Sequence, residues 1–133
     1  LPQIASQMSP AAQRLSQRFW PGPLTLVVAR RSTLPKNLSP LPTVGVRMPN
    51  HPDALALLNL AGPLAVTSAN LSGASNTQTA PEVFAQLSGL IPLILDGGRT
   101  PGGAPSTVVD CTNPEVPILR VGPITKEQIL AAL

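Results

Sequence analysis

The residues of this sequence best suited to chemistry are small hydroxyl and amide side chains that follow an apolar segment. Ser68 and Asn70 come directly after the largely apolar residues 64–67. In open α/β sheets, ligands bind beyond the carboxyl ends of strands, where short side chains and backbone N–H groups can contact phosphate or carboxylate oxygens. Two interpretations of residues 68–73 stay open: an anion site, or a turn whose side chains satisfy their own backbone.

Two arginines share a second feature, because Arg47 and Arg120 each lie in or at the end of an apolar segment. An isolated buried charge is too costly, so such a guanidinium is paired, points into a cavity, or reaches water from an edge strand. Ser106 begins another apolar segment, after the glycine-rich residues 97–103. Convergence of these groups from different strands predicts a pocket for an anionic substrate.

Several other kinds of site lack the residues they need. Cysteine and histidine occur once each, as Cys111 and His51, so a protein-held zinc or other transition metal is not expected. A Ser-His-Asp triad would need His51, whose position before Pro52 favours a role at a helix start. The glycine-rich residues 97–103 lack the lysine of a phosphate-binding P-loop.

Composition indicates a folded domain with a mild positive charge. Apolar residues make up 43% of the 133 positions and charged residues 11%, so the 17 prolines and 10 glycines separate short elements rather than signal disorder. A net charge of +3 fits an anion pocket better than a broad nucleic-acid surface, and the scarcity of aromatic residues argues against base stacking. The single cysteine and the lack of a membrane-spanning run or signal peptide predict a cytoplasmic protein with no membrane partner.

Short apolar runs separated by turn residues predict an α/β domain with a mixed sheet. Helices are expected at residues 10–19, 51–61, 79–87 and 125–130, and strands at 24–29, 43–48, 64–68, 92–96, 107–110 and 118–121. The strand at 24–29 is expected to be buried on both faces because it is almost wholly apolar. The helix at 79–87 is expected to bury Val83, Phe84 and Leu87.

Five segments, in this order, resemble the YrdC-like family of L-threonylcarbamoyladenylate synthases. They are RFWPGPLT at 18–25, VRMP at 46–49 with His51, SANLSG at 68–73, STVVD at 106–110 and LRVG at 119–122. The resemblance implies a twisted mixed sheet flanked by helices, in a single YrdC-like domain over residues 1–133. It also implies that L-threonine, bicarbonate and ATP are condensed into threonylcarbamoyl-AMP with release of pyrophosphate.

The resemblance further implies which residues bind each substrate. Arg47, Ser68 and Ser106 match the family's threonine contacts, and Thr43, Asn70 and Arg120 match its ATP contacts. No side chain is expected to act as a covalent catalyst, and Mg²⁺ is expected to be held mainly by the ATP phosphates. The product would pass to proteins that transfer the threonylcarbamoyl group to tRNA, and tRNA or double-stranded RNA is a possible direct partner.

The sequence departs from the family pattern at several positions. In the family, a glutamate usually precedes the Ser-Thr-Val stretch and a proline usually follows the Leu-Arg pair; this sequence has Pro105 and Val121 at those positions. Where the family commonly has Ser-Pro-Thr, residues 76–78 of this sequence read Asn-Thr-Gln. The family's Lys-x-Arg motif, normally ahead of the Trp-Pro-Gly-Pro segment, does not occur. We therefore expect an N-terminally incomplete domain that synthesises little or no threonylcarbamoyl-AMP by itself.

Two alternatives remain open from the sequence. The chain could be the YrdC-like domain of a larger carbamoyl-transferring protein, such as those that mature hydrogenases, and a requirement for threonine would exclude this. It could instead be a non-catalytic module that binds double-stranded RNA, with an affinity that falls steeply with salt. The residues that would support RNA binding are Arg14, Arg18, Arg30, Arg31 and Lys36.

Overall fold

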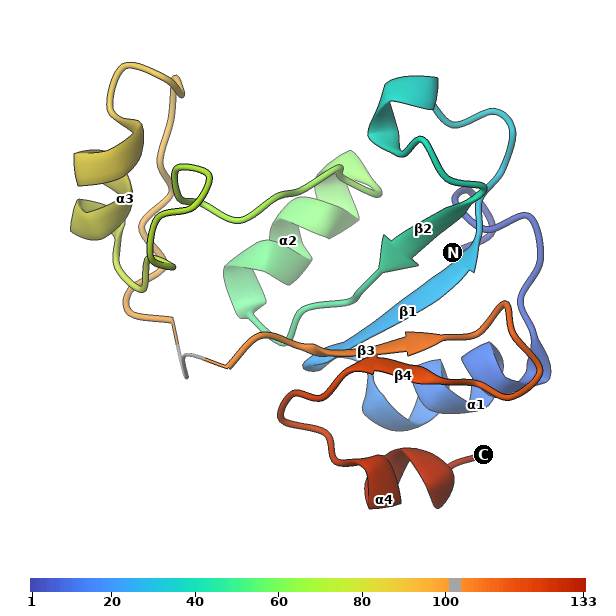
Figure 1. Cartoon of the computed structure of the whole chain (residues 1–133). Coiled ribbons are helices and arrows are strands. Elements are labelled where there is room, and N and C mark those ends of the chain that lie inside the picture. Colours follow the sequence, from blue (N-terminus) through green and yellow to red (C-terminus); the bar gives the residue numbers. More distant parts are fainter. Residues whose placement is uncertain (101–103) are drawn as a thin grey trace. The chain divides into compact units, whose positions relative to one another are not determined.

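A computed structural model describes residues 1–100 and 104–133 as a mixed sheet with helices (Figure 1). The elements in chain order are α1 (Pro10–Phe19), β1 (Leu24–Ala29), the 3-10 turn η1 (Lys36–Leu38), β2 (Thr43–Val46), α2 (Pro52–Ala61), α3 (Ala80–Leu87), β3 (Thr107–Asp110), β4 (Ile118–Arg120) and α4 (Lys126–Leu130). The backbone groups into two compact units, which are described separately below. Unit 1 comprises Leu1–Leu64 and Ala104–Leu133, and unit 2 comprises Ala65–Gly103.

The sheet of unit 1 confirms the mixed topology expected from the sequence. Its strand order is β2-β1-β3-β4. β1 and β3 run parallel, with Leu24 beside Thr107, whereas β2 and β4 run antiparallel to their neighbours. β2 ends at Val46 and β4 at Arg120, so each is shorter at its carboxyl end than expected.

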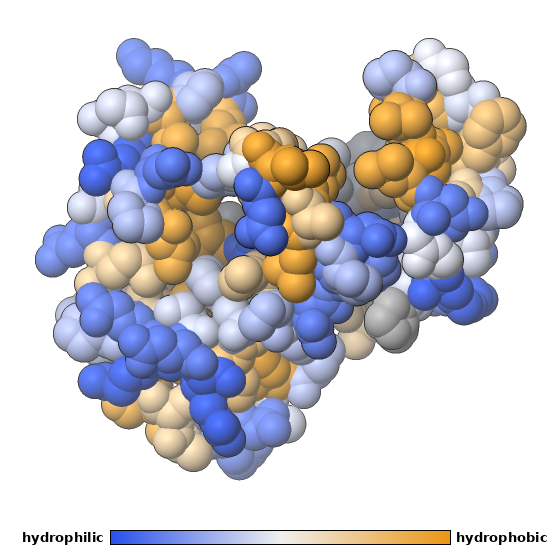
Figure 2. Space-filling view, turned by 180° about the vertical axis from the view of Figure 1, so that it is seen from behind, coloured by the Kyte–Doolittle hydropathy of each residue, from blue (hydrophilic) through white to orange (hydrophobic). Residues whose placement is uncertain are grey.

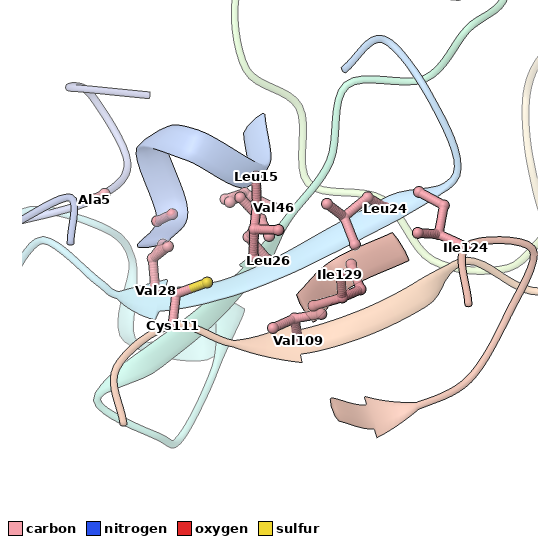
Figure 3. Close-up of a cluster of buried hydrophobic side chains, with 11 residues drawn as sticks. Ala5, Leu15, Leu24, Leu26, Val28, Val46, Val109, Cys111, Ile124 and Ile129 are labelled. Carbon is pink, nitrogen blue, oxygen red and sulfur yellow. The ribbon is translucent and has the colours of Figure 1, made fainter. Parts of the chain in front are cut away.

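The core of unit 1 lies between the sheet and helix α1. Leu15 of α1 and alternate residues of β1, among them Leu24 and Leu26, are fully buried (Figure 3). The other side chains of β1 are half-buried. The expectation that β1 is buried on both faces was therefore wrong, because α1 covers a single face of this strand.

Capping residues set the starts of helices α3 and α4. Thr125 and Gln128 form a capping box at the start of α4, in which each side chain accepts a hydrogen bond from the other residue's backbone N–H. Thr79 caps α3 by accepting from the Glu82 backbone N–H at 3.4 Å. The Glu82 carboxylate in turn accepts from the backbone N–H of Gln78 at 2.7 Å.

Three sequence expectations in or beside unit 2 were wrong. Residues 64–68 and 92–96 are not strands, since neither run finds a neighbouring strand among the described residues with which to share backbone hydrogen bonds. Phe84 is 61% exposed rather than buried, and its helix α3 buries no side chain fully. An apolar pattern favours a strand or a packed helix face, but burial requires a second surface.

None of the helices in residues 1–100 and 104–133 has the length and apolar character needed to cross a lipid bilayer.

Cys111 gives the core of unit 1 a testable pH dependence. Burial, together with the neighbouring Asp110 carboxylate, raises the pKa of its thiol from an ordinary 9.0 to about 11. The unfolded chain therefore loses this proton at a lower pH than the folded chain does. The thiol's contribution to stability is complete below about pH 9 and is lost as the pH rises towards 11.

We expect the free energy of unfolding, measured by urea titration, to fall between pH 9 and 11 by on the order of 2 kcal/mol more in the wild type than in Cys111→Ala. The alanine variant keeps both lysines, and the chain has no tyrosine, so the difference isolates the thiol. Parallel pH profiles for the two proteins would contradict the assignment.

Candidate functional site

Polar side chains from four strands meet at one end of the sheet in unit 1. Arg47 follows the last residue of β2, and Arg120 is the last residue of β4. Ser106 precedes β3, and Thr25 is the second residue of β1. Because β2 and β4 are antiparallel to β1 and β3, this edge combines the carboxyl ends of two strands with the amino ends of the other two.

Ser106 is the centre of this group and is 6% exposed. Its hydroxyl lies 2.7 Å from the Thr25 hydroxyl. Arg120 contacts the same residue twice: Nε donates to the Ser106 carbonyl at 3.0 Å, and Nη2 donates to the Ser106 hydroxyl at 3.2 Å. The Arg120 guanidinium is thus held in place by neutral groups, which leave its positive charge uncompensated.

Arg47 is held by the Trp-Pro-Gly-Pro segment. Its Nε donates to the Gly22 carbonyl at 2.9 Å. Gly22 is required there, because a Cβ at this position would lie 2.3 Å from the Phe19 carbonyl oxygen. Trp20 restrains the same turn by donating from Nε1 to the Leu24 carbonyl at 2.7 Å. The turn therefore positions Arg47 through a backbone oxygen rather than through a carboxylate.

The electrostatics of this group favour an anion. Burial, and then the nearby positive charge of Arg120, lower the pKa of Arg47. Across residues 1–100 and 104–133, neither guanidinium forms an ion pair with a carboxylate. Two neighbouring guanidiniums without a counter-charge are best stabilised by an anionic ligand, and Arg groups bind carboxylate or phosphate with two parallel hydrogen bonds.

Thr107 holds the turn that follows Arg120 in place through hydrogen bonds of its side chain. Its fully buried hydroxyl donates to the Ile124 carbonyl at 2.7 Å and accepts from the backbone N–H groups of Gly122 and Ile124 at 3.0 and 3.1 Å. Gly122 lies against the backbone of the Ser106 segment, where a Cβ would be 2.3 Å from the Pro105 carbonyl oxygen. The turn that follows Arg120 is thereby fixed to the strand that carries Ser106.

The six site residues predicted from the sequence fall into two groups. Arg47, Ser106 and Arg120 are brought together in unit 1 by the contacts above. Thr43 is also in unit 1 but begins β2, where it pairs with Ala29 at the other end of the strand from Arg47. Ser68 and Asn70 belong to unit 2.

In unit 2, the Asn70 side chain supports parts of both interpretations of residues 68–73. Its Nδ2 donates to the carbonyls of Leu71 and Ala74 at 2.9 and 3.1 Å, as a turn that satisfies its own backbone requires. Its Oδ1 is buried and has no hydrogen-bond partner among the described residues. One acceptor is therefore left over for a donor that the turn itself does not supply.

The sequence analysis missed Thr25, Gly22 and Thr107 as positioning residues. Thr25 and Gly22 lie in the RFWPGPLT segment and Thr107 in the STVVD segment, both of which had been singled out without a role for these residues. Only the parallel pairing of β1 with β3 shows that the two segments are adjacent.

His51 and Asp53 take structural positions at the start of helix α2. His51 stands at the N-cap of α2, with Nδ1 4.0 Å from the Asp53 carboxylate, which agrees with a role at a helix start. No group of three or more metal-ligating side chains occurs in the described part of the chain.

The buried hydroxyl of Thr107 gives a test of the site's support. We expect Thr107→Val to lower the free energy of unfolding by about 1–3 kcal/mol, because it leaves one carbonyl and two N–H groups without their partner. Thr107→Ser keeps the hydroxyl and should lose less, about 1 kcal/mol for one methyl group. Urea denaturation compares the two variants, and a valine variant as stable as the serine variant would contradict the proposed hydrogen bonds.

Comparisons with known proteins identify the family of this chain. The Sua5/YciO/YrdC family model, described as "Telomere recombination", matches residues 1–122. A threonylcarbamoyl-AMP synthase of Bacillus subtilis is 47% identical over an alignment of 128 positions, which covers 92% of this chain and 36% of the relative. A Mycobacterium tuberculosis relative is 40% identical over 131 residues, which are 98% of this chain and 60% of the relative.

Solved structures match over the same span. The crystal structure of Pyrococcus abyssi Sua5 complexed with L-threonine superposes with a TM-score of 0.92 at 40% identity, covering 98% of this chain and 39% of that one. Escherichia coli YciO gives a TM-score of 0.81 at 29% identity, covering 92% of this chain and 60% of that one. The chain thus spans between about a third and three fifths of the relatives it matches. With a family match over residues 1–122, it belongs to the Sua5/YciO/YrdC family.

Proposed function

We propose that this chain carries substrate-binding residues of a threonylcarbamoyl-AMP synthase, which forms threonylcarbamoyl-AMP and pyrophosphate from L-threonine, bicarbonate and ATP. The observation that carries the proposal is the pair of guanidiniums, Arg47 and Arg120, set beside the Ser106 hydroxyl without a carboxylate partner among the described residues. A relative with 40% identity was solved in complex with L-threonine, which supports an amino acid as one ligand.

In unit 1, the proposed threonine contacts are Arg47 and Ser106; in unit 2, taken by itself, the proposed threonine contact is Ser68. The Nε atom of Arg47 is engaged by Gly22, and its two Nη groups make no hydrogen bond to the described residues. They therefore remain free to bind a carboxylate with two hydrogen bonds. The Ser106 hydroxyl can donate to a ligand oxygen while it accepts from Arg120.

In unit 1, the proposed ATP contacts are Arg120 and Thr43; in unit 2, taken by itself, the proposed ATP contact is Asn70. Arg120 keeps Nη1 free of hydrogen bonds to the described residues, so it can bind a phosphate oxygen while it stays on Ser106. The Asn70 Oδ1 acceptor suits an N–H donor of the nucleotide. We propose that Mg²⁺ arrives with ATP and is ligated mainly by its phosphates.

The chemistry assigned to these residues is positioning and charge stabilisation. The carbamate oxygen of carboxylated threonine attacks the α-phosphorus of ATP, and the bond from that phosphorus to pyrophosphate breaks. Negative charge builds on the transferring phosphoryl oxygens, where a fixed guanidinium stabilises it without a covalent enzyme intermediate. Arg120 is suited to this role because Ser106 holds two of its nitrogens.

The product of the proposed reaction is threonylcarbamoyl-AMP. In the proposed pathway this product passes to proteins that modify tRNA in the cytoplasm. We propose no direct RNA surface. We also propose that full synthesis needs cationic groups beyond these 133 residues.

Calorimetric titration of the chain with L-threonine tests the threonine site. We expect Arg47→Gln to weaken threonine binding by about tenfold or more, because the two charge-assisted hydrogen bonds from the Arg47 guanidinium to the threonine carboxylate are lost. Arg14→Gln is the matched control, since Arg14 is an exposed arginine on α1 that makes no contact with this group. Equal affinities of the wild type and Arg47→Gln would contradict the proposed function.

A further inference from the structure

Hydrogen bonds from side chains, rather than a hydrophobic core, hold the loop of residues 69–77 in unit 2. No residue of the span 65–100 is fully buried. Figure 2 shows hydrophobic side chains at the molecular surface, and Leu71 within the loop is 46% exposed. A loop that lacks buried apolar contacts keeps a single shape only if its backbone polar groups have fixed partners.

Two side chains of the loop bind the loop's own backbone. The Asn70 Nδ2 group donates to the carbonyls of Leu71 and Ala74 at 2.9 and 3.1 Å, and the Thr77 hydroxyl donates to the carbonyl of Ala69 at 2.9 Å. Because an amide nitrogen has two hydrogens, the two Nδ2 bonds fix the orientation of the Asn70 amide. Its buried Oδ1, which has no partner among the described residues, is the atom that Asn70 offers to a ligand.

Gln86 of helix α3 holds the same loop from outside. Its Oε1 accepts from the backbone N–H of Leu71 at 3.0 Å, and its Nε2 donates to the carbonyl of Ser75 at 3.2 Å. Between these two contacts the chain makes a tight turn, in which the backbone N–H of Ala74 donates to the carbonyl of Leu71 at 2.9 Å. One half-buried amide group therefore fastens both ends of the turn to a helix.

A glutamine suits this position because the loop presents one donor and one acceptor. A carboxylate would have no hydrogen for the Ser75 carbonyl, and a lysine or arginine would have no acceptor for the Leu71 N–H. The Gln86 amide supplies both groups, and α3 gives it a rigid base because Thr79 caps the first turn of that helix.

We infer that Gln86 is a positioning residue, which holds Asn70 in its ligand-binding orientation before the nucleotide arrives. This inference rests on the proposed function, in which Asn70 contacts ATP. A loop that is already ordered loses little conformational freedom when a ligand binds, so its order contributes to affinity. Loss of the Gln86 amide should therefore weaken ATP binding although Gln86 itself makes no contact with ATP.

Calorimetric titration of the 133-residue chain with ATP and Mg²⁺ tests the inference. We expect Gln86→Met, which keeps the length of the side chain but not its hydrogen bonds, to weaken ATP binding by about tenfold. Gln13→Met is the matched control: Gln13 lies on α1 in unit 1, where its Nε2 donates to the Met8 carbonyl at 3.3 Å. This control loses a similar hydrogen bond and should bind ATP as the wild type does.

A double-mutant cycle separates positioning from a general structural effect. If Gln86 acts through Asn70, then Gln86→Met should cause no further loss of ATP affinity in an Asn70→Ala background. Hydrogen exchange reads the loop directly, because the Leu71 amide should exchange faster in Gln86→Met than in the wild type or in Gln13→Met. Equal exchange of this amide in all three proteins would overturn the inference.

The outcomes also separate this inference from the proposed function. ATP binding by the wild type that Gln86→Met leaves unchanged would overturn the inference alone. An equal further loss in the Asn70→Ala background would do the same, because Gln86 would then act independently of Asn70. A wild-type chain that does not bind ATP would overturn the proposed ATP contact and, with it, the inference.

Discussion

The parallel pairing of β1 with β3 is the constraint on which the candidate site depends. It sets Leu24 beside Thr107, and so brings the Trp-Pro-Gly-Pro turn next to a segment more than 80 residues later in the chain. The hydroxyls of Thr25 and Ser106 can then lie 2.7 Å apart. β2 and β4 flank this pair in the opposite direction, and at the same end of the sheet Arg47 directly follows β2 and Arg120 ends β4. A register shift of one residue would turn Thr107 out of the core and remove the site's support.

The arginines differ from ordinary surface charges in how they are held. Each uses Nε on a backbone carbonyl, Arg47 on Gly22 and Arg120 on Ser106, so the guanidinium plane is oriented while its charge remains uncompensated. Keeping the Arg47 guanidinium charged costs free energy, because partial burial and, secondarily, the like charge of Arg120 lower its pKa. A carboxylate or phosphate ligand would relieve it, so strain in the free protein becomes affinity for an anion.

Much of unit 1 could be predicted from local sequence patterns, but unit 2 could not. Ser9 caps α1 by accepting from the backbone N–H of Ala12, and this cap, the Thr125 cap and the apolar run of β1 each specify an element within a few neighbouring residues. Arg47, Ser106 and Arg120 could be identified because polar groups at the ends of apolar segments are unusual. The supporting roles of Thr25 and Thr107 could not be identified, since they depend on strand register rather than on residue type. The runs at 64–68 and 92–96 show the converse, because a strand-like pattern becomes a strand only when a partner supplies hydrogen bonds.

A crystal structure of the chain with L-threonine would test the central claim most directly. The account predicts the ligand's carboxylate on the Nη groups of Arg47, within hydrogen-bond distance of the Ser106 hydroxyl, with Arg120 still donating to the Ser106 carbonyl. Threonine bound elsewhere on the protein, with Arg47 and Ser106 making no contact to it, would contradict the account.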